Sequence, residues 1–432
     1  MPSSAIGPLI LFLALLLTAA HLLGHFFTRL RQPRVIGEIL AGVLLGPFVL
    51  GRLSAFTHLL QLDVAAAPKK AALDLIFQLG LLMLMFISGA ETKALFQRHE
   101  LKQIAWLTAL GTGLPFFATL GVAWIVPLTW FLGAKQNRVA LLLVMSIAVA
   151  VTSIPVIARI FFDLKILHTR FARLVLGVAV LEDIGLWAVL AVATALAEFA
   201  GLPQQKIAFH VLVTLIYFAL GLTLAPRAMK RISKSRFNLL AVNNPVSFTL
   251  LIAFSYVAVA GMMGVNPVFA AFLAGFAVSR KRLGEALETI SRFSFALFIP
   301  VYFALVGYGL IFNQGFSILM LVGFLTWACL VKLISVALGA HFAGFRGLDV
   351  INLAVATNAR GGPGIVLAGV AYEAGIISPA FYTTLVLVAV LTSQAAGAWL
   401  EFVLRRGWPL LTGVGLGSAG PASEKTPEEL AA

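Results

Sequence analysis

Apolar runs of about 20 residues recur along almost the whole chain, and each is long enough to cross the ~30 Å hydrocarbon core of a bilayer as a helix. Of the 432 residues, 61% are hydrophobic and only 11% are charged. Typical soluble domains carry about 25% charged residues. This composition excludes a water-soluble enzyme, and we expect an all-α, multi-pass membrane protein.

Breaks at charged or Pro/Gly-rich stretches predict about thirteen transmembrane helices. The expected spans are residues 8–29, 33–50, 71–90, 103–127, 138–161, 173–199, 207–226, 246–263, 266–280, 290–312, 316–340, 350–375 and 380–404. The longest internal polar stretch, 227–245, is expected to be a loop. Residues 1–406 then form a transmembrane domain, and residues 407–432, which are rich in Gly, Ser, Pro and Glu, form a short disordered cytoplasmic tail.

The distribution of basic residues predicts the orientation of the chain. Of the 31 Lys and Arg residues, 23 fall in loops of one face and 6 in loops of the other, while Lys332 and Arg360 lie inside spans. Cytoplasmic loops are enriched in Lys and Arg, so we expect the N-terminus outside and the C-terminus in the cytoplasm.

The net charge of +14 is dispersed over these loops and does not indicate a nucleic-acid partner. The first span is not a typical cleavable signal peptide, because its positive residues follow the apolar run.

Two of the expected spans are interrupted in comparable ways. Residues 138–161 contain Thr152-Ser153-Ile154-Pro155, and residues 350–375 contain Asn358-Ala359-Arg360-Gly361-Gly362-Pro363-Gly364. Pro155 and Pro363 are 208 positions apart, close to half the chain. A single such span is usually an ordinary kink, but broken helices at corresponding positions of two halves indicate the binding site of a transporter.

Four ionisable residues lie deep within expected spans: Glu182, Asp183, Lys332 and Arg360. Each costs ~2.5 to 3.5 kcal/mol on insertion scales, so such residues face a partner, a cavity or a pathway. Neighbouring helical residues point about 100° apart, so Glu182 and Asp183 cannot both face one small site. One acid can then bind an ion while the other pairs with an opposite helix, and a purely structural pair of Glu182 with Lys332 is the competing interpretation.

Asp183 is the expected ion ligand, together with the hydroxyls of Thr152 and Ser153 and the carbonyls freed at the first break. Oxygen ligands suit a hard monovalent cation such as Na⁺ or K⁺. Burial and a neighbouring carboxylate both disfavour the ionised acid, so a proton and a metal cation compete for the same group. That competition alone produces exchange. Arg360 is expected to neutralise the opposed helix ends or to hold a carboxylate.

The other acidic residues of the spans are expected to be structural. Glu38 either reaches the membrane surface or pairs with Arg34, and Asp74, Glu91 and Glu373 lie near span ends.

The sequence contains no signature of an intramembrane protease, of a phosphate-binding loop or of a serine hydrolase. The single cysteine, Cys329, supports neither a disulfide nor a metal cluster. We therefore expect a transporter driven by an ion gradient, not an enzyme, and no cofactor.

Several separated motifs resemble the monovalent cation:proton antiporter family, in the branch of Kef-type potassium efflux systems, bacterial sodium/proton antiporters and plant cation/proton exchangers. The resemblance covers residues 5–405. Its motifs are GEILAGVLLGP at Gly37–Pro47, FISGAE at Phe86–Glu91, TSIPV at Thr152–Val156, the Glu182–Asp183 pair, NPVFAAFLAG at Asn266–Gly275, Lys332, and NARGG at Asn358–Gly362. Glu182 departs from the family, in which Asp, Asn or Gln usually stands at that position, and this leaves the number of protons per cation open.

The resemblance implies thirteen helices in two inverted repeats, with two crossed discontinuous helices. It further implies a dimerisation panel, a mobile core that moves like an elevator, and a homodimer. By the same resemblance Asp183 carries the ion or proton, Thr152 and Ser153 line its site, and Lys332 pairs with Glu182 when no proton is bound. We expect exchange of Na⁺ or K⁺ for H⁺ across a bacterial inner membrane. The alternatives are a channel-like or sensor protein with structural ion pairs, or the same fold carrying an organic anion.

Overall fold

The computed structural model describes residues 3–30, 32–47, 49–52, 67–95, 100–167, 169–198, 203–233, 238–278, 280–310 and 316–412. Apart from an isolated bridge between Leu132 and Ile377, the regular structure in these ranges is helical. The expected all-α fold is therefore confirmed. Most of the tail at 407–432 and the junction 311–315 between two expected spans lie outside the described residues, so the disordered tail stays a prediction.

The described chain contains both long helices and shorter ones. The elements are α1 (Ser3–Arg29), α2 (Arg34–Leu45), η1 (Leu50–Arg52), α4 (Ala67–Leu95), α5 (Leu101–Thr108), η2 (Ala109–Gly113), α6 (Leu114–Ile125), α7 (Arg138–Ala150), α8 (Ile154–Asp163), α9 (Arg170–Glu198), α10 (Gln204–Ile232), α11 (Leu239–Asn243), α12 (Pro245–Met262), α13 (Pro267–Ala277), α14 (Arg280–Ala296), α15 (Phe298–Tyr308), α16 (Ile318–Phe342), α17 (Leu348–Ala356), α18 (Gly361–Glu373) and α19 (Pro379–Arg405). Some of the shorter helices follow one another directly, such as α7 and α8 or α17 and α18. Between one and three helical elements lie in each of the thirteen expected ranges.

Within the described ranges, nine helical segments are long and apolar enough to cross a bilayer. They are Ile6–Arg29, Lys70–Glu91, Leu101–Ile125, Arg170–Glu198, Gln205–Ile232, Pro245–Met262, Leu283–Tyr308, Ile318–Phe342 and Pro379–Arg405. Two shorter apolar helices, Arg138–Ala150 and Pro267–Ala277, add to them. The chain is therefore a multi-pass membrane protein. The total of thirteen crossings and the repeat symmetry stay predictions.

The largest differences between the expected spans and the structure occur in three places. α2 ends at Leu45 instead of residue 50, because Gly46 is extended before Pro47, and a residue before proline disfavours helical geometry. The span expected at 290–312 is two helices, α14 and α15, separated at Leu297 by a non-helical backbone conformation. The loop expected at 227–245 is wrong in part, since α10 continues to Ile232 and α11 forms within it.

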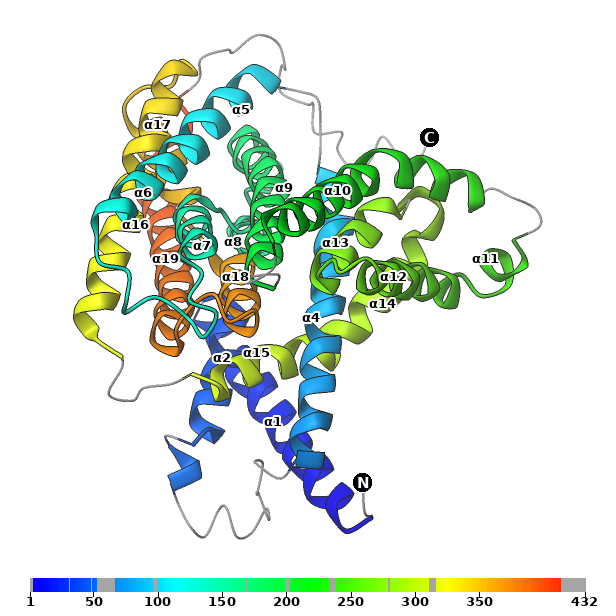
Figure 1. The fold of residues 1–432 in the computed structure, drawn as a ribbon. Coiled ribbons are helices and arrows are strands. Elements are labelled where there is room, and N and C mark those ends of the chain that lie inside the picture. Colours follow the sequence, from blue (N-terminus) through cyan, green and yellow to red (C-terminus); the bar gives the residue numbers. More distant parts are fainter. Residues whose placement is uncertain are drawn as a thin grey trace, which may run out of the picture.

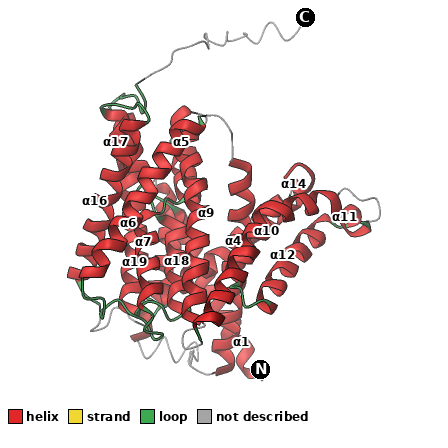
Figure 2. Cartoon of the chain, turned by 45° about the horizontal axis from the view of Figure 1, so that its top comes forward, coloured by secondary structure: helices red, strands yellow, loops and turns green. Residues whose placement is uncertain are grey.

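The helices fall into two groups that pack mainly within themselves. The first, which we call the core group, comprises α5–α9 and α16–α19; the second, the panel group, comprises α1, α2, α4 and α10–α15. In Figure 1 the core group lies at the left, while α10–α14 lie at the right and α1, α2 and α15 below. Figure 2 shows α5, α9, α16 and α19 close together and α12 and α14 standing apart from them.

Two helix crossings in the panel group depend on glycine. A Cβ built on Gly42 of α2 would lie 1.7 Å from the carbonyl oxygen of Ala304 in α15. A Cβ on Gly275 of α13 would lie 1.8 Å from the carbonyl oxygen of Phe86 in α4. Small residues let membrane helices approach closely enough for backbone contact. These glycines therefore fix how the helices of the panel group cross.

Candidate ion-exchange site

Two broken helices meet at the centre of the core group. After α7 the backbone is extended at Val151, and after α17 it is interrupted at residues 357–360. The two interruptions are joined, since the backbone N–H of Ser153 donates to the carbonyl of Ala359 at 2.6 Å and the Thr152 hydroxyl donates to the carbonyl of Thr357. The expected pair of crossed discontinuous helices is thus present in the structure.

Two buried cations cap the end of α7, where the last carbonyls of a helix lack intrahelical partners. The Arg360 guanidinium donates to the carbonyls of Ala148 and Val149, both at 3.0 Å. The Lys332 ammonium donates to the carbonyl of Ala150. These contacts fit the first of the two alternatives for Arg360, at the end of α7; its charge-compensating role stays a prediction.

Arg360 also joins this end of α7 to two other elements. It donates to the carbonyl of Ala328 in α16 at 2.8 Å and to the side-chain oxygen of Asn358 at 2.9 Å. Only 2% of its surface is exposed. Its planar group therefore positions α7, α16 and the second break relative to one another.

The two acids of α9 have opposite surroundings, although they are adjacent in the chain. The Oε1 atom of Glu182 accepts from Lys332 Nζ at 2.7 Å and from the Thr112 hydroxyl at 2.6 Å. Asp183 is fully buried, and within the described part of the chain neither of its carboxylate oxygens has a hydrogen-bond partner. The structure thus separates the two acids, as their helical positions require.

A buried ionised carboxylate without a donor is strongly unfavourable. Asp183 is therefore stable in this position when a proton or a cation neutralises it. Chemically, the arrangement can hold one positive species at a time at this carboxylate.

The hydroxyls of Thr152 and Ser153 are fully buried beside the crossing. The Ser153 oxygen accepts from the backbone N–H of Val156 at 3.4 Å, while the Thr152 hydroxyl is directed at Thr357. Their oxygen lone pairs can still coordinate a cation. Their role as ligands of the ion stays a prediction.

A cavity of about 790 Å³ lies between the panel group and the core group. Its lining includes His21, Arg34, Glu38, Trp187, Pro363 and Val156. Trp187 belongs to α9. Pro363 and Val156 lie near the beginning of α18 and α8, the helices that follow the two breaks, so the cavity reaches both of them. Asp183 itself does not line the cavity, but Trp187 follows it by one helical turn on the same face of α9.

Two of the acids expected to be structural, Glu38 and Glu373, have partners on the panel side. The Arg34 side chain binds Glu38 at 2.9 Å and also His21, so the pairing of Glu38 with Arg34 is confirmed. Glu373 accepts from Gln78 at 2.9 Å, across the boundary between α18 and α4. These contacts explain their place in the spans without a role in the site.

The sequence did not single out Thr112, Thr357 or Ser393, which the structure places at the site. Ser393 accepts from the backbone N–H of Gly361 at 3.0 Å and so caps α18. Lone Thr and Ser residues are ordinary in membrane helices, because their hydroxyls can bond to the preceding turn. For Thr112, the pattern Gly111-Thr112-Gly113 inside an apolar span was the available signal.

The sequence pattern of the family described as "Sodium/hydrogen exchanger, transmembrane" matches residues 11–406. The chain belongs to the sodium/hydrogen exchanger family. The expectation of a cation:proton antiporter family is confirmed.

Curated relatives of this exchanger come from several kingdoms. The Na⁺/H⁺-K⁺ antiporter GerN of Bacillus cereus is 26% identical, over 90% of this chain and 95% of that protein. The cation/H⁺ antiporter 18 of Arabidopsis thaliana is 29% identical, over 89% of this chain and 47% of its own length. The K⁺/H⁺ antiporter 1 of Saccharomyces cerevisiae is 28% identical, over 90% of this chain and 46% of its own length. The exchanger thus spans about half the length of the plant and yeast proteins.

Among solved structures, the fold matches the sodium proton antiporter MjNhaP1 of Methanocaldococcus jannaschii. The TM-score is 0.60 at 15% identity, and the match covers 93% of this chain and 99% of that one. A second structure of the same antiporter gives a TM-score of 0.62 at 17% identity, with 98% and 100% coverage. The exchanger therefore has the sodium/proton antiporter fold.

Proposed function

We propose that this exchanger moves Na⁺ or K⁺ in one direction and protons in the other, with Asp183 as the shared binding group. The observation that carries the proposal is the fully buried Asp183 carboxylate, whose two oxygens lack partners within the described residues. Binding one proton or one cation neutralises it, and binding one excludes the other. Two gradients are then coupled without any further energy source.

The surrounding charges support a cation as cargo. Lys332 is engaged by Glu182 and Ala150, and Arg360 is engaged by carbonyls, so neither presents a free positive group to an anion. An organic-anion carrier would need exposed helix N-termini or unpaired cations at this place. The relatives' names include both Na⁺ and K⁺, and the cargo is one or both of these ions.

A channel or sensor would not need Asp183. Structural pairing accounts for Glu182, Lys332 and Arg360, each of which has specific partners. It does not account for Asp183, because an unpaired buried acid stabilises nothing. Transport therefore explains one more residue than a purely structural interpretation does.

We further propose that the core group moves against the panel group, as an elevator does. The 790 Å³ cavity between them supports this, because it leads from the His21 and Arg34 region toward the crossing. The excess of Lys and Arg in the loops of one face favours an outside N-terminus, and with that orientation the cavity would open toward the cytoplasm of a bacterial inner membrane. The panel group would also form the contact between two copies in a homodimer.

The test uses purified protein in proteoliposomes that carry a proton gradient and a pH-sensitive dye. The native exchanger should dequench the dye when NaCl or KCl is added, but not when choline chloride is added. Asp183→Asn should abolish this response, whereas Asp74→Asn, which neutralises an exposed acid of α4, should leave it unchanged. An undiminished response in Asp183→Asn would refute the carrier assignment.

A further inference from the structure

The chain turns back over the core group directly after α19. Gly407 has a φ of +69°, which glycine adopts without strain, and the backbone N–H of Trp408 donates to the carbonyl of Val403 at 3.1 Å. This is the usual glycine-dependent end of a helix, and Pro409 prevents the helix from resuming. We call residues 407–412 the strap.

The strap is bound to α17, the first half of the second broken helix. The backbone N–H and the hydroxyl of Thr412 both donate to Oδ1 of Asp349, at 2.6 and 2.9 Å. The side-chain amide of Asn352 donates to the carbonyl of Leu410 at 3.1 Å. Asp349 and Asn352 are three positions apart and so lie on one face of α17, and both are buried. That face of α17 therefore holds the strap.

Asn352 also connects the strap to the end of α19. Its side-chain oxygen accepts from the indole N–H of Trp399 at 3.0 Å, while its amide nitrogen donates to the strap. Leu410 is buried in the same apolar cluster as Leu353 of α17 and Val403 of α19. The end of α19, the strap and α17 thus pack as one unit.

α17 needs such contacts, because it is short and uncapped. It has nine residues, and Gly347 at its N-cap position contributes no side-chain hydrogen bond. The interruption at residues 357–360 separates it from α18. Helices of this length are not stable by themselves in water, so their position depends on what surrounds them. For α17 the surroundings are α9, α16, α19 and the strap.

The other end of α17 leads into the crossing of the broken helices. The carbonyl of Thr357, which directly follows α17, accepts from the Thr152 hydroxyl, and the carbonyl of Ala359 accepts from the backbone N–H of Ser153. A nine-residue helix is about 13 Å long and moves as a rigid rod over this distance. A displacement at Asp349 is therefore carried to the oxygens beside Asp183.

We propose that the strap, bound through Asp349 and Asn352, is a positioning element of the exchange site, which holds α17 in register with the first broken helix. This inference rests on the proposed exchange function. Without the strap, α17 shifts, the oxygens at the crossing lose their arrangement, and the cation binds less tightly. A strap that only stabilised the protein would change the amount of active exchanger, but not the cation concentration at which exchange is half-maximal.

The first experiment measures this cation concentration by dye dequenching in proteoliposomes, with NaCl or KCl. Asp349→Ala should raise it about three- to tenfold, the size of effects that residues outside a site exert through packed elements. Asp349→Asn keeps an oxygen that can accept both hydrogen bonds of Thr412 and should stay close to the native value. Glu288→Ala is the control, because it removes an exposed carboxylate of α14 in the panel group and should leave the value unchanged.

Thr412→Ala tests the same contact from the strap side and replaces an exposed residue, so it should fold if Asp349→Ala does not. It loses the hydroxyl but keeps the backbone N–H, and should raise the half-maximal concentration less than Asp349→Ala does. The double variant should equal Asp349→Ala, because the hydroxyl has then already lost its acceptor. Additive effects would contradict action through this contact.

Hydrogen–deuterium exchange at residues 348–356 reports on α17 without any transport. Asp349→Ala should speed exchange of these amides, and Asp349→Asn should not. A native half-maximal concentration in both Asp349→Ala and Thr412→Ala, or a change confined to the maximal rate, would overturn the role of the strap and leave the proposed function intact. A native protein that gives no cation-dependent signal would overturn the proposed function, whatever the amides of α17 show.

Discussion

The Nζ atom of Lys332 lies 2.7 Å from Oε1 of Glu182, and both side chains are completely shielded from solvent. A pair of this kind in the interior stabilises less than its distance implies, because both charges lose their hydration. Removing one partner, however, leaves the other charge buried and uncompensated. The pair therefore makes a clear prediction for stability.

Lys332→Met alone should destabilise the protein by about 3 to 5 kcal/mol, because the Glu182 carboxylate then stays buried without its positively charged partner. Combining it with Glu182→Gln should recover most of that loss, because no buried charge is then left unpaired. Thermal unfolding of the native protein, the two single variants and the double variant in detergent measures this coupling. Additive losses in the double variant would show that the two side chains do not depend on each other.

Arg360 should be among the residues on which stability depends most strongly. Arg360→Ala leaves the carbonyls of Ala148, Val149 and Ala328 without their donor, and we expect a loss of about 3 kcal/mol or more. Arg360→Lys should recover only part, since an ammonium cannot reproduce the planar fork. Arg138→Ala is the control: Arg138 also donates to a carbonyl, that of Trp124, but at an exposed position. Equal unfolding temperatures for the two alanine variants would contradict this role of Arg360.

The glycine crossings of the panel group should resist even the smallest enlargement. Gly42→Ala and Gly275→Ala each place a methyl group on a backbone carbonyl, and we expect a loss of at least about 1 to 3 kcal/mol. Gly323→Ala in α16 meets no atom within 4 Å and should be neutral or slightly stabilising. The yield of monodisperse protein and its unfolding temperature distinguish these variants. A tolerated Gly42→Ala would mean that α2 and α15 are farther apart than described.

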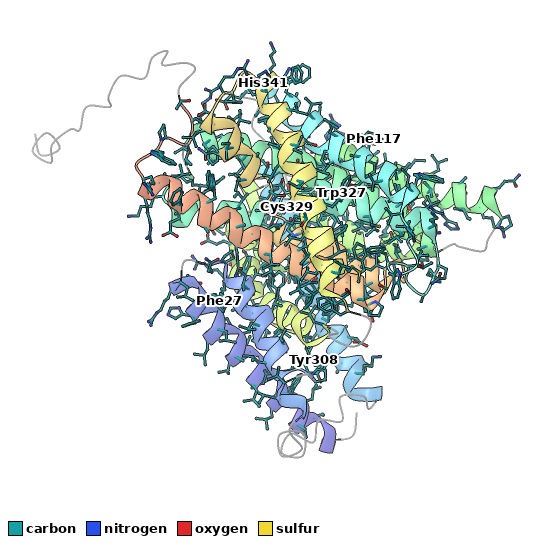
Figure 3. All side chains as sticks on the ribbon, turned by 90° about the vertical axis from the view of Figure 1, so that its left-hand side faces the viewer. Phe27, Phe117, Tyr308, Trp327, Cys329 and His341 are labelled. Atoms are coloured by element: carbon teal, nitrogen blue, oxygen red, sulfur yellow. The ribbon has the colours of Figure 1, made fainter. Side chains whose placement is uncertain are left out.

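The orientation can be tested with single cysteines, because Cys329 is the one cysteine of the chain. It lies midway along α16, near Trp327, as Figure 3 shows. In a Cys329→Ala background, cysteine at Lys135 should react in intact cells with a membrane-impermeant maleimide, and cysteine at Arg346 should react only after lysis. Both positions are exposed in the structure. The reverse pattern would invert the proposed topology.

Much of this arrangement could be predicted from sequence, because charges and breaks inside apolar spans are costly and therefore informative. The need of each buried charge for a partner indicates some pairing among the four ionisable residues of the spans, while the specific pairing of Glu182 with Lys332 is the structural interpretation and is also what the family resemblance implies. The two breaks followed from Pro155 and Pro363, which lie in the first turn of α8 and α18, where a missing N–H costs little.

The remaining features depend on tertiary packing that no local pattern encodes. The acceptors of Arg360 are backbone carbonyls of α7 and α16, and any residue type could supply them. Thr112 reaches Glu182 only through the π-helical turn η2 and the close approach of Gly111 to Val336. The contact of Trp327 with Thr119, at 3.1 Å, likewise joins helices whose proximity the sequence does not reveal.

In the proposed exchange, one carboxylate, that of Asp183, binds either a proton or an alkali cation. Proton release on cation binding measures this directly, with purified protein in weakly buffered detergent solution and a pH indicator. Adding NaCl or KCl, but not choline chloride, should release protons from the native protein and none from Asp183→Asn. Equal release from the native protein and from Asp183→Asn would contradict the claim.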